Sequence, residues 1–477
     1  MMEGFGVHTF RFIDAGGGSR FVKFHWRPRL GAQSVLWDEA CKINGADQDF
    51  HRRDLWQAIA RGDVPAFEFS VQVFDEAFAE RFEFDVLDAT KLIPEELVPL
   101  QPIGRIVLDR NPDNFFAETE QVAFHPGNLV PGIDVSDDPL LQGRLFSYVD
   151  TQLSRLGGPN FHQLPINRPQ CPMRNFQRDG HMQMMVPTGR VAYEPNSLAP
   201  DGPREDPHRG FVTFAGTTRG LKTRHRSETF ADHYSQARMF YRSLTESEKG
   251  HMIAAFAFEL AKVETVEIRR RMLGHLRLID VTLLEGVERA LGMEGQADII
   301  VPARAPIELA PSPALSLMGK ALPTLLGRTV GALVSDGCDG GLIERLRIAL
   351  ERESARLEII APKIAGVTTD RGERLQADHA LGGGPSVLFD AVVVVTSDAG
   401  AAALSDEPRA IDWVRDAYRH LKVIGYVLAA KLLIESALVA RDRGVIELDA
   451  SDGTETFVAS AQEGRVWGRE RKFRSPD

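Results

Sequence analysis

The sequence predicts a multi-domain α+β protein, in which an antiparallel sheet and a helical module are followed by a separate α/β domain. Its 477 residues exceed what one hydrophobic core normally supports, so several domains are expected. Eighteen of the 27 phenylalanines precede residue 180 and three follow residue 300, which indicates that the two ends of the chain build different cores. Strand-like and helical segments alternate regularly only in the last third.

Short aromatic and β-branched runs, bounded by Gly, Pro and Asp, predict antiparallel strands in the first 90 residues. The predicted strands are residues 7–13, 20–25, 67–74 and 82–86, and a predicted helix over residues 37–61 interrupts them. From about residue 100 to 225, repeated X-Pro pairs disfavour regular ladders. An irregular stretch of this length is usually functional or wraps around a neighbour.

The second half predicts two further units. Residues 228–292 have amphipathic helical spacing, with a capping box from Thr245 to Glu248. A proline-rich linker then leads to alternating elements, with strands predicted at 329–334, 357–361, 391–396 and 422–427 and helices at 341–355, 408–420 and 428–437. This alternation predicts a parallel sheet flanked by helices, as in flavodoxin-like folds. The expected units are 1–110, 111–226, 227–295, 296–326 and 327–477.

Composition argues against several function classes. The 56 basic and 67 acidic residues give a net charge of −11, which disfavours a phosphate-tracking surface, so nucleic acid is not an expected partner. No run approaches the roughly 18 apolar residues that span a bilayer, so no membrane partner is expected. The three cysteines are far apart without CxxC spacing and no leader-like segment opens the chain, which predicts a reducing, cytoplasmic location.

The residues with the clearest chemical meaning are Arg144 and Tyr148. They are four residues apart, so on a helix they share one face and the guanidinium can reach the phenol oxygen. A permanent positive charge favours the phenolate, and a phenolate is a good ligand for a ferric ion. The alternative is a buried tyrosine with a satisfied hydroxyl beside an arginine at a helix end, and the spacing alone does not decide between the two.

Four longer sequence motifs favour the metal-ligand role of Tyr148 over the buried-tyrosine alternative. They are Gly4 to Phe10 (GFGVHTF), Asn111 to Glu118 (NPDNFFAE), Leu140 to Tyr148 (LLQGRLFSY) and Gly157 to Phe161 (GGPNF). With these motifs, residues 1 to about 290 resemble the monofunctional haem catalases, and the additional last domain resembles that of the large-subunit clade. The resemblance implies that residues 1–110 are the C-terminal part of the catalase β-barrel, a partial barrel, and that residues 111–226 are the wrapping arm on the proximal side of the haem.

The resemblance also assigns roles to individual residues. Tyr148 corresponds to the proximal ligand of the haem iron, and Arg144 to the guanidinium that keeps this ligand ionised. In the family a His and an Asp hold that arginine, and they fall on His8 and Asp138, so the four residues form a proximal relay.

Four more residues are expected at the cofactor. Arg155 matches a family arginine that pairs with a haem propionate, Phe124 matches a ring packed on the porphyrin, and Gln152 lies one turn beyond the ligand. His125 stands 23 residues before Tyr148, where some large-subunit members join a histidine to the Cβ of the haem tyrosine. The alternative for His125 is an ordinary loop histidine.

The activity implied by the family is disproportionation of hydrogen peroxide to water and oxygen through an oxoferryl intermediate, in a homotetramer that binds haem b or d. Family members use a distal His and Asn to move a proton and orient peroxide. Nothing in this chain resembles that distal segment, so we expect it to be an N-terminally truncated catalase. The alternative is a non-enzymatic remnant that binds haem or serves only a structural role.

The last domain resembles the class I glutamine-amidotransferase-like family. Relatives carry a nucleophilic cysteine in a sharp turn after a strand, and here the matching residue is Leu428, which cannot attack a carbonyl. Cys338 is the only thiol of this domain, and a plain loop or core cysteine is a better reading than a reactive one. We therefore expect this domain to stabilise the protein or to support its oligomer.

Overall fold

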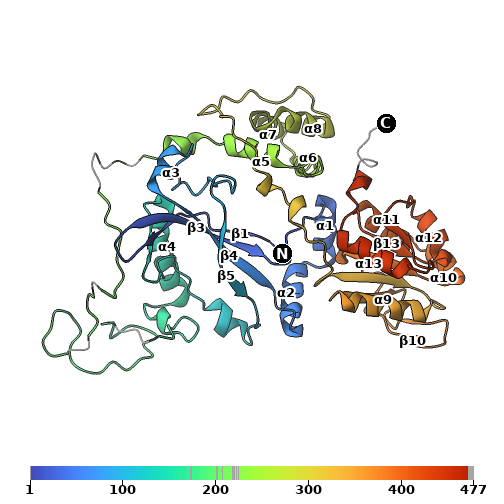
Figure 1. The fold of residues 1–477 in the computed structure, drawn as a ribbon, viewed down its shortest axis with the longest axis horizontal. Helices are drawn as coiled ribbons and strands as arrows, with labels where there is room; N and C mark the ends of the chain where they lie inside the picture. The colour runs from blue at the N-terminus through green and yellow to red at the C-terminus, as the bar shows by residue number, and fades with distance from the viewer. Residues whose placement is uncertain are drawn as a thin grey trace.

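The computed structural model describes residues 2–171, 175–199, 202–206, 208–217, 221, 223 and 225–470. Its N-terminal sheet and its C-terminal α/β domain lie at opposite ends of the long axis, and helices of the middle of the chain lie along one side of both (Figure 1). The predicted multi-domain α+β architecture is therefore confirmed.

In the described part of the chain, the N-terminal half forms a six-stranded antiparallel sheet. Its strands are β1 (Gly4–Phe5), β2 (Phe10–Ile13), β3 (Ser19–Pro28), β4 (Ala66–Phe74), β5 (Gln101–Val107) and β6 (Ile133–Val135). The order is β5-β4-β3-β2-β6, with β1 paired to β3, so β5 and β6 are the edges of an open sheet. The strands predicted at 7–13, 20–25 and 67–74 are present with shifted ends.

Alternation along the strands gives the sheet two different faces. On one face the rings of Phe24 and Phe69 stack at 5.7 Å and Trp26 stacks on Phe69 at 5.2 Å, all half-buried. On the other face Phe21 and Phe74 are buried in a small core together with Val86, Ile93 and Val98. Cross-strand pairs of this kind are the main stabilising unit of a sheet.

Two predictions for this half were wrong. The helix expected over 37–61 is two helices, α1 (Trp37–Ala46) and α2 (Phe50–Arg61), because Asp47 adopts an extended conformation and its carboxylate accepts hydrogen bonds from the Asp49 amide and Arg53. Residues 82–86 are not a strand: Phe84 and Val86 pack beneath the sheet, and the Val86 carbonyl accepts a hydrogen bond from Thr9 instead of forming a ladder.

The stretch expected to be irregular contains regular elements. Pro102 does not prevent β5 because β5 is an edge strand, where proline is tolerated. After β6 comes the long helix α4 (Pro139–Leu156), which begins at Asp138 with proline in its first turn and ends at Gly157 in the left-handed conformation. Both ends of α4 thus follow standard helix signals.

The middle of the chain forms the helical module. Its helices are α5 (Ser235–Ser243), α6 (Glu246–Ala261), α7 (Val266–Ile279) and α8 (Val281–Leu291). The short helix α3 (Glu76–Arg81), which follows β4, instead packs on the core of the N-terminal sheet. The predicted capping box is confirmed, since the Glu248 amide donates to Thr245 Oγ1 and the Thr245 amide donates to the Glu248 carboxylate. Leu273, Leu276 and Val287 are fully buried in the core of α5 to α8. Among the described residues, no helix is long and apolar enough to cross a membrane.

The C-terminal domain is built on a parallel sheet with the order β11-β8-β7-β12-β13-β14. Its strands are β7 (Thr329–Val334), β8 (Arg356–Ala361), β11 (His379–Ala380), β12 (Ala391–Val395), β13 (Ile424–Tyr426) and β14 (Val445–Glu447), and β9 (Val367–Thr368) and β10 (Arg374–Leu375) form a separate hairpin. Its helices are α9 (Gly340–Arg352), α10 (Asp398–Ser405), α11 (Pro408–Arg419), α12 (Lys431–Ser436) and α13 (Gly453–Glu463). The predicted parallel pairing is confirmed, and the central strands are completely buried.

The core of this domain gives a direct stability prediction. Leu346 on α9 is fully buried, whereas Ile348, two residues further, is 42% exposed. Leu346→Ala leaves a cavity and should lower the free energy of unfolding by about 2–5 kcal/mol. Ile348→Ala on the same helix should cost less than about 1 kcal/mol. Urea unfolding of the two variants measures both values, and equal losses would contradict the packing described here.

Candidate functional site

Helix α4 presents Arg144 and Tyr148 on one face, as its spacing predicts. An Nη2 atom of Arg144 donates a hydrogen bond to the Tyr148 hydroxyl at 2.5 Å, and the guanidinium carbon lies 4.9 Å from the centre of the tyrosine ring. Both side chains are half-buried. A fixed positive charge at this distance stabilises negative charge on the phenol oxygen.

The second pair of the predicted relay is also formed. His8 Nδ1 lies 2.6 Å from Asp138 Oδ2, and the two residues are 6% and 1% exposed. The other carboxylate oxygen of Asp138 accepts hydrogen bonds from the backbone amides of Leu140 and Leu141, so it caps α4. One carboxylate therefore connects the segment before β2 to the helix that carries Tyr148.

Burial opposes ionisation of Asp138, but the hydrogen bonds from His8 and from the Leu141 and Leu140 amides hold the pKa of its carboxyl below the ordinary value. The carboxylate is thus charged at neutral pH and accepts from His8 Nδ1. Within the described residues, no hydrogen bond joins His8 to Arg144. The structure therefore forms two separate pairs from these four residues, His8 with Asp138 and Arg144 with Tyr148.

Lys23 is a charged residue at this site that the sequence analysis missed. It is 3% exposed, and its ammonium donates to the carbonyl oxygen of Val7, next to His8, at 2.8 Å. Burial lowers the pKa of Lys23 to about 8, against the opposing effect of the Asp138 and Asp88 charges. Its sequence signal is alternation: in β3, Lys23 follows the buried Phe21 by two residues and shares its face of the sheet.

Gln152 and Arg155 of α4 donate hydrogen bonds to backbone carbonyls of residues 120–124. The Gln152 amide nitrogen donates to the Phe124 carbonyl at 3.1 Å, and Arg155 donates to the Gln152 side-chain oxygen at 2.6 Å and to the Val122 carbonyl at 2.5 Å. Arg155 also donates to the carbonyl of Glu120. These bonds hold the backbone of Phe124 against the helix face of Tyr148, while the Phe124 ring is 77% exposed.

His125 lies beside Tyr148. The two rings are perpendicular, with centres 6.4 Å apart. His125 Nε2 is 2.9 Å from the Leu145 carbonyl oxygen, so it carries the proton, and Nδ1 accepts a hydrogen bond from the Gly127 amide. All the predicted site residues on α4 and in the preceding loop are thus gathered on one side of that helix.

The opposite face of α4 has a different character. Phe146, Val149 and Leu153 lie on it at spacings of three and four residues, and they are 77%, 40% and 40% exposed. We call these three residues the outer stripe of α4. An apolar stripe of this kind on a helix is typical of a surface that another protein covers.

The candidate residues of the C-terminal domain behave differently. Cys338 is completely buried, and burial raises the pKa of its thiol to about 11, so it is not a thiolate at neutral pH. Leu428 follows β13, its side chain is half exposed, and its amide donates to Asp449 at 2.5 Å. In the described ranges, no group of three or more His, Cys, Asp or Glu side chains forms a candidate metal site.

Comparison with known proteins agrees with this geometry. Three family models match: catalase over residues 1–200, catalase-related immune-responsive over 227–291, and the C-terminal domain found in long catalases over 326–471. Catalase C of Rhizobium meliloti (strain 1021) is 55% identical over 474 residues, which are 98% of this chain and 67% of that protein. Catalase HPII of Pseudomonas putida is 47% identical (98% and 66%), and Catalase-2 of Bacillus subtilis (strain 168) is 44% identical (98% and 68%).

The chain belongs to the catalase family, a family of enzymes, and the matches to its three parts assign it to the large-subunit monofunctional catalases. It spans about two thirds of the length of the curated relatives it matches.

Asp138 allows a test of the site's architecture. Asp138→Asn keeps an oxygen that can cap α4 but removes the charge, whereas Asp138→Ala removes both. We expect the alanine variant to lose about 2–4 kcal/mol of unfolding free energy and the asparagine variant less. Because folding lowers the pKa of Asp138, its contribution is present above the ordinary aspartate pKa and is lost as the pH falls through the folded value.

Urea unfolding of both variants as a function of pH measures this contribution. The control is Asp137→Asn, because Asp137 is the exposed neighbour and its change should stay within about 0.5 kcal/mol. Equal losses at positions 137 and 138, or an unchanged pH dependence in Asp138→Asn, would be incompatible with the double role of this carboxylate.

Proposed function

We propose that the protein is a haem catalase that disproportionates hydrogen peroxide to water and oxygen, with Tyr148 as the residue that would bind the iron. The observation that carries the proposal is the 2.5 Å hydrogen bond from Arg144 to the Tyr148 hydroxyl, at a half-buried position on a helix matched by the catalase model. The Arg144 guanidinium is placed to pair with the phenol oxygen of a tyrosine that binds iron, as the ligand role requires.

The surroundings of Tyr148 fit a haem group. The Tyr148 oxygen is a donor of the type that binds ferric iron, and the Phe124 ring, whose backbone carbonyl is held by Gln152, offers an exposed apolar surface. When bound, an iron porphyrin supplies the two-electron redox chemistry that peroxide disproportionation needs. Arg155 lies one helical turn beyond Gln152 and is the arginine that the family resemblance pairs with a propionate.

The other residues of the site act through position and charge. Arg144 stabilises the anionic form of Tyr148, and the Asp138 carboxylate fixes the start of α4 and the orientation of His8. The proposal includes electrostatic coupling between these two pairs, as the family relay implies. A second-shell arrangement of this kind tunes how strongly a ligand donates to its metal.

A substitution of the ligand tests the proposal. Tyr148→Phe removes the oxygen and leaves the ring, so haem should bind with a changed Soret band and oxygen evolution from peroxide should fall by at least about 100-fold. The matched control is Tyr193→Phe, since Tyr193 is 64% exposed and lies outside the site. Both chains are loaded with haemin and compared by absorption spectroscopy and with an oxygen electrode.

Unchanged spectra and unchanged oxygen evolution in Tyr148→Phe would overturn the ligand assignment. The alternative function is a haem-binding or structural protein without turnover. A haem-binding protein without turnover would show a Soret band and evolve no oxygen. A purely structural protein would show no Soret band and evolve no oxygen. Oxygen evolution by the haemin-loaded chain that Tyr148→Phe abolishes would exclude this alternative.

We also propose that His125 Nδ1 becomes covalently joined to the Cβ of Tyr148 during turnover. The new C–N bond replaces a Cβ–H bond, the imidazole loses its N–H proton, and one hydrogen peroxide takes up the two electrons and two protons and is reduced to two waters. Its support is the perpendicular approach of the two rings at 6.4 Å and the tautomer in which Nδ1 carries no proton. Peptide mass spectrometry after exposure of the haem-loaded chain to peroxide should give a peptide containing both residues, absent from His125→Gln. Two separate unmodified peptides in the peroxide-treated sample would contradict the link.

The proposed assembly is a homotetramer, and its support is the outer stripe of α4, which turns an apolar surface away from the haem side. The proposed location is the cytoplasm, in keeping with the three free cysteines, two of them exposed. For the C-terminal domain we propose a flavodoxin-like, amidotransferase-like fold without catalysis. The strand order β8-β7-β12-β13-β14 supports the fold, and Leu428 and the buried Cys338 support the absence of catalysis.

A further inference from the structure

Helix α1 buries an ionisable side chain where a helix normally buries apolar ones. Of its ten residues, Glu39 is the buried one, with 1% of its surface exposed. Trp37 packs edge-on against Phe258 of α6, but its side chain is otherwise exposed. A carboxylate is buried only if it finds charged or hydrogen-bonding partners, so the partners of Glu39 explain the position of this helix.

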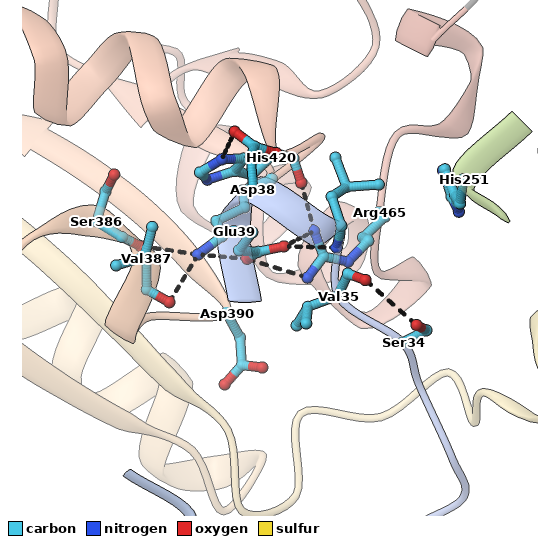
Figure 2. A network of polar contacts seen from close by, with 12 residues as sticks. Ser34, Val35, Asp38, Glu39, His251, Ser386, Val387, Asp390, His420 and Arg465 are labelled. Carbon is cyan, nitrogen blue, oxygen red and sulfur yellow. Dashed lines mark hydrogen bonds and ion pairs between the residues drawn. The ribbon is translucent and has the colours of Figure 1, made fainter. Parts of the chain in front are cut away.

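Those partners come from the C-terminal domain. Figure 2 shows the Glu39 carboxylate among residues of the C-terminal domain that lie more than 340 residues later in the sequence. Lys422 Nζ is 3.2 Å from Glu39 Oε1, and Arg465 approaches both oxygens, with Nη1 at 2.9 Å from Oε2 and Nη2 at 3.2 Å from Oε1. The fork of Arg465 thus binds Glu39 in the bidentate manner that strengthens ion pairs.

Both cations are removed from solvent. Lys422 is 2% exposed and the Arg465 side chain is 15% exposed. The three hydrogens of the Lys422 ammonium are matched by backbone carbonyls of its own domain, those of Ser386, Val387 and Phe389. Carbonyls satisfy its hydrogen bonds but carry no net charge, so the counter-charge in contact with Lys422 is the carboxylate on α1.

A second polar contact runs parallel to the first. His420 is 1% exposed, and its Nε2 lies 3.2 Å from Asp38, the neighbour of Glu39 on α1. Asp390 also faces Lys422 electrostatically, but it already pairs with Arg328 at 3.1 Å. At the rim, Lys42 and Asp416 form an exposed pair at 2.6 Å across the same contact.

We propose that α1 is the docking surface for the C-terminal domain and that Glu39 is its ionic anchor, without which the domain separates from the rest of the chain while remaining folded. The inference is independent of the haem chemistry. Breaking a buried ion pair by removing one partner is strongly destabilising because it leaves the other charge buried and uncompensated. Here Lys422 and Arg465 share the carboxylate of Glu39. Once that negative charge is removed, the two cations can be hydrated only if the domain separates from α1.

The charge of Glu39 is present under ordinary conditions. Burial opposes its ionisation, but the charges of Lys422 and Arg465 outweigh that effect and hold its pKa below the usual glutamate value. Its contribution is therefore complete above the ordinary glutamate pKa and is lost only as the pH falls through the lowered folded value. The docked state should persist across the neutral range.

The test is Glu39→Gln in the full chain, with hydrogen–deuterium exchange read by mass spectrometry. Glutamine keeps the size and the hydrogen-bonding oxygen of the side chain but not its charge. We expect exchange to rise about 100-fold in residues 37–46 and 386–388, which face each other across the contact. Strands β7 and β12 should keep their protection, because they form the core of the domain itself.

The control variant is Lys42→Ala, which breaks the exposed pair at the rim of the same contact. It should leave exchange in residues 37–46 and 386–388 unchanged, since exposed ion pairs contribute little. Arg465→Gln removes one of the two cations that bind Glu39 and should raise exchange in the same two segments.

Three results would overturn the proposal. In the first, Glu39→Gln leaves residues 37–46 and 386–388 as protected as in the unmodified chain. In the second, β7 and β12 lose protection together with these segments, which would mean that the domain unfolds instead of undocking. In the third, Lys42→Ala has the same effect as Glu39→Gln, which would show that the charge of Glu39 has no special role.

Discussion

The carboxylate of Asp138 accepts hydrogen bonds on both of its oxygens, and the position of Tyr148 depends on both sets. One oxygen fixes the first turn of α4 through the amides of Leu140 and Leu141, and the other holds His8, which lies between β1 and β2. Because a helix is rigid over its ten residues from Asp138 to Tyr148, fixing its first turn also fixes the direction in which the phenol points. The orientation of Tyr148 therefore depends on the N-terminal cap of α4.

A buried carboxylate connects distant parts of the chain in a second place, at Glu39, but with a different balance of forces. Asp138 accepts hydrogen bonds from two backbone amides and from His8, so its position is fixed by directional contacts within the N-terminal half of the chain. Glu39 is satisfied by two full positive charges from another domain. Charges removed from water attract each other strongly, but burying them costs free energy. Such a contact is therefore lost when any one of its charged partners is removed.

Much of the site was predictable from the sequence because its signals are local. The four-residue spacing of Arg144 and Tyr148 places them on one helix face whatever the rest of the chain does. The break of the predicted 37–61 helix at Asp47 was not predictable in the same way. Helix propensity alone does not reveal that the Asp47 side chain accepts a hydrogen bond from the Asp49 amide. The burial of Glu39 was not predictable for another reason: its partners Lys422 and Arg465 lie in another domain, and the sequence around Glu39 does not indicate that contact.

The pairing of β6 with β2 has a consequence for how the protein acquires its fold. Phe10 pairs with Val135, so this pair closes a loop of more than 120 residues, whereas β2, β3 and β4 pair with near neighbours in sequence. Closing so long a loop carries a large entropic cost before any contact offsets it, which makes such steps slow. Since α4 begins four residues after β6, the place of the helix that carries Tyr148 depends on the same long-range pairing.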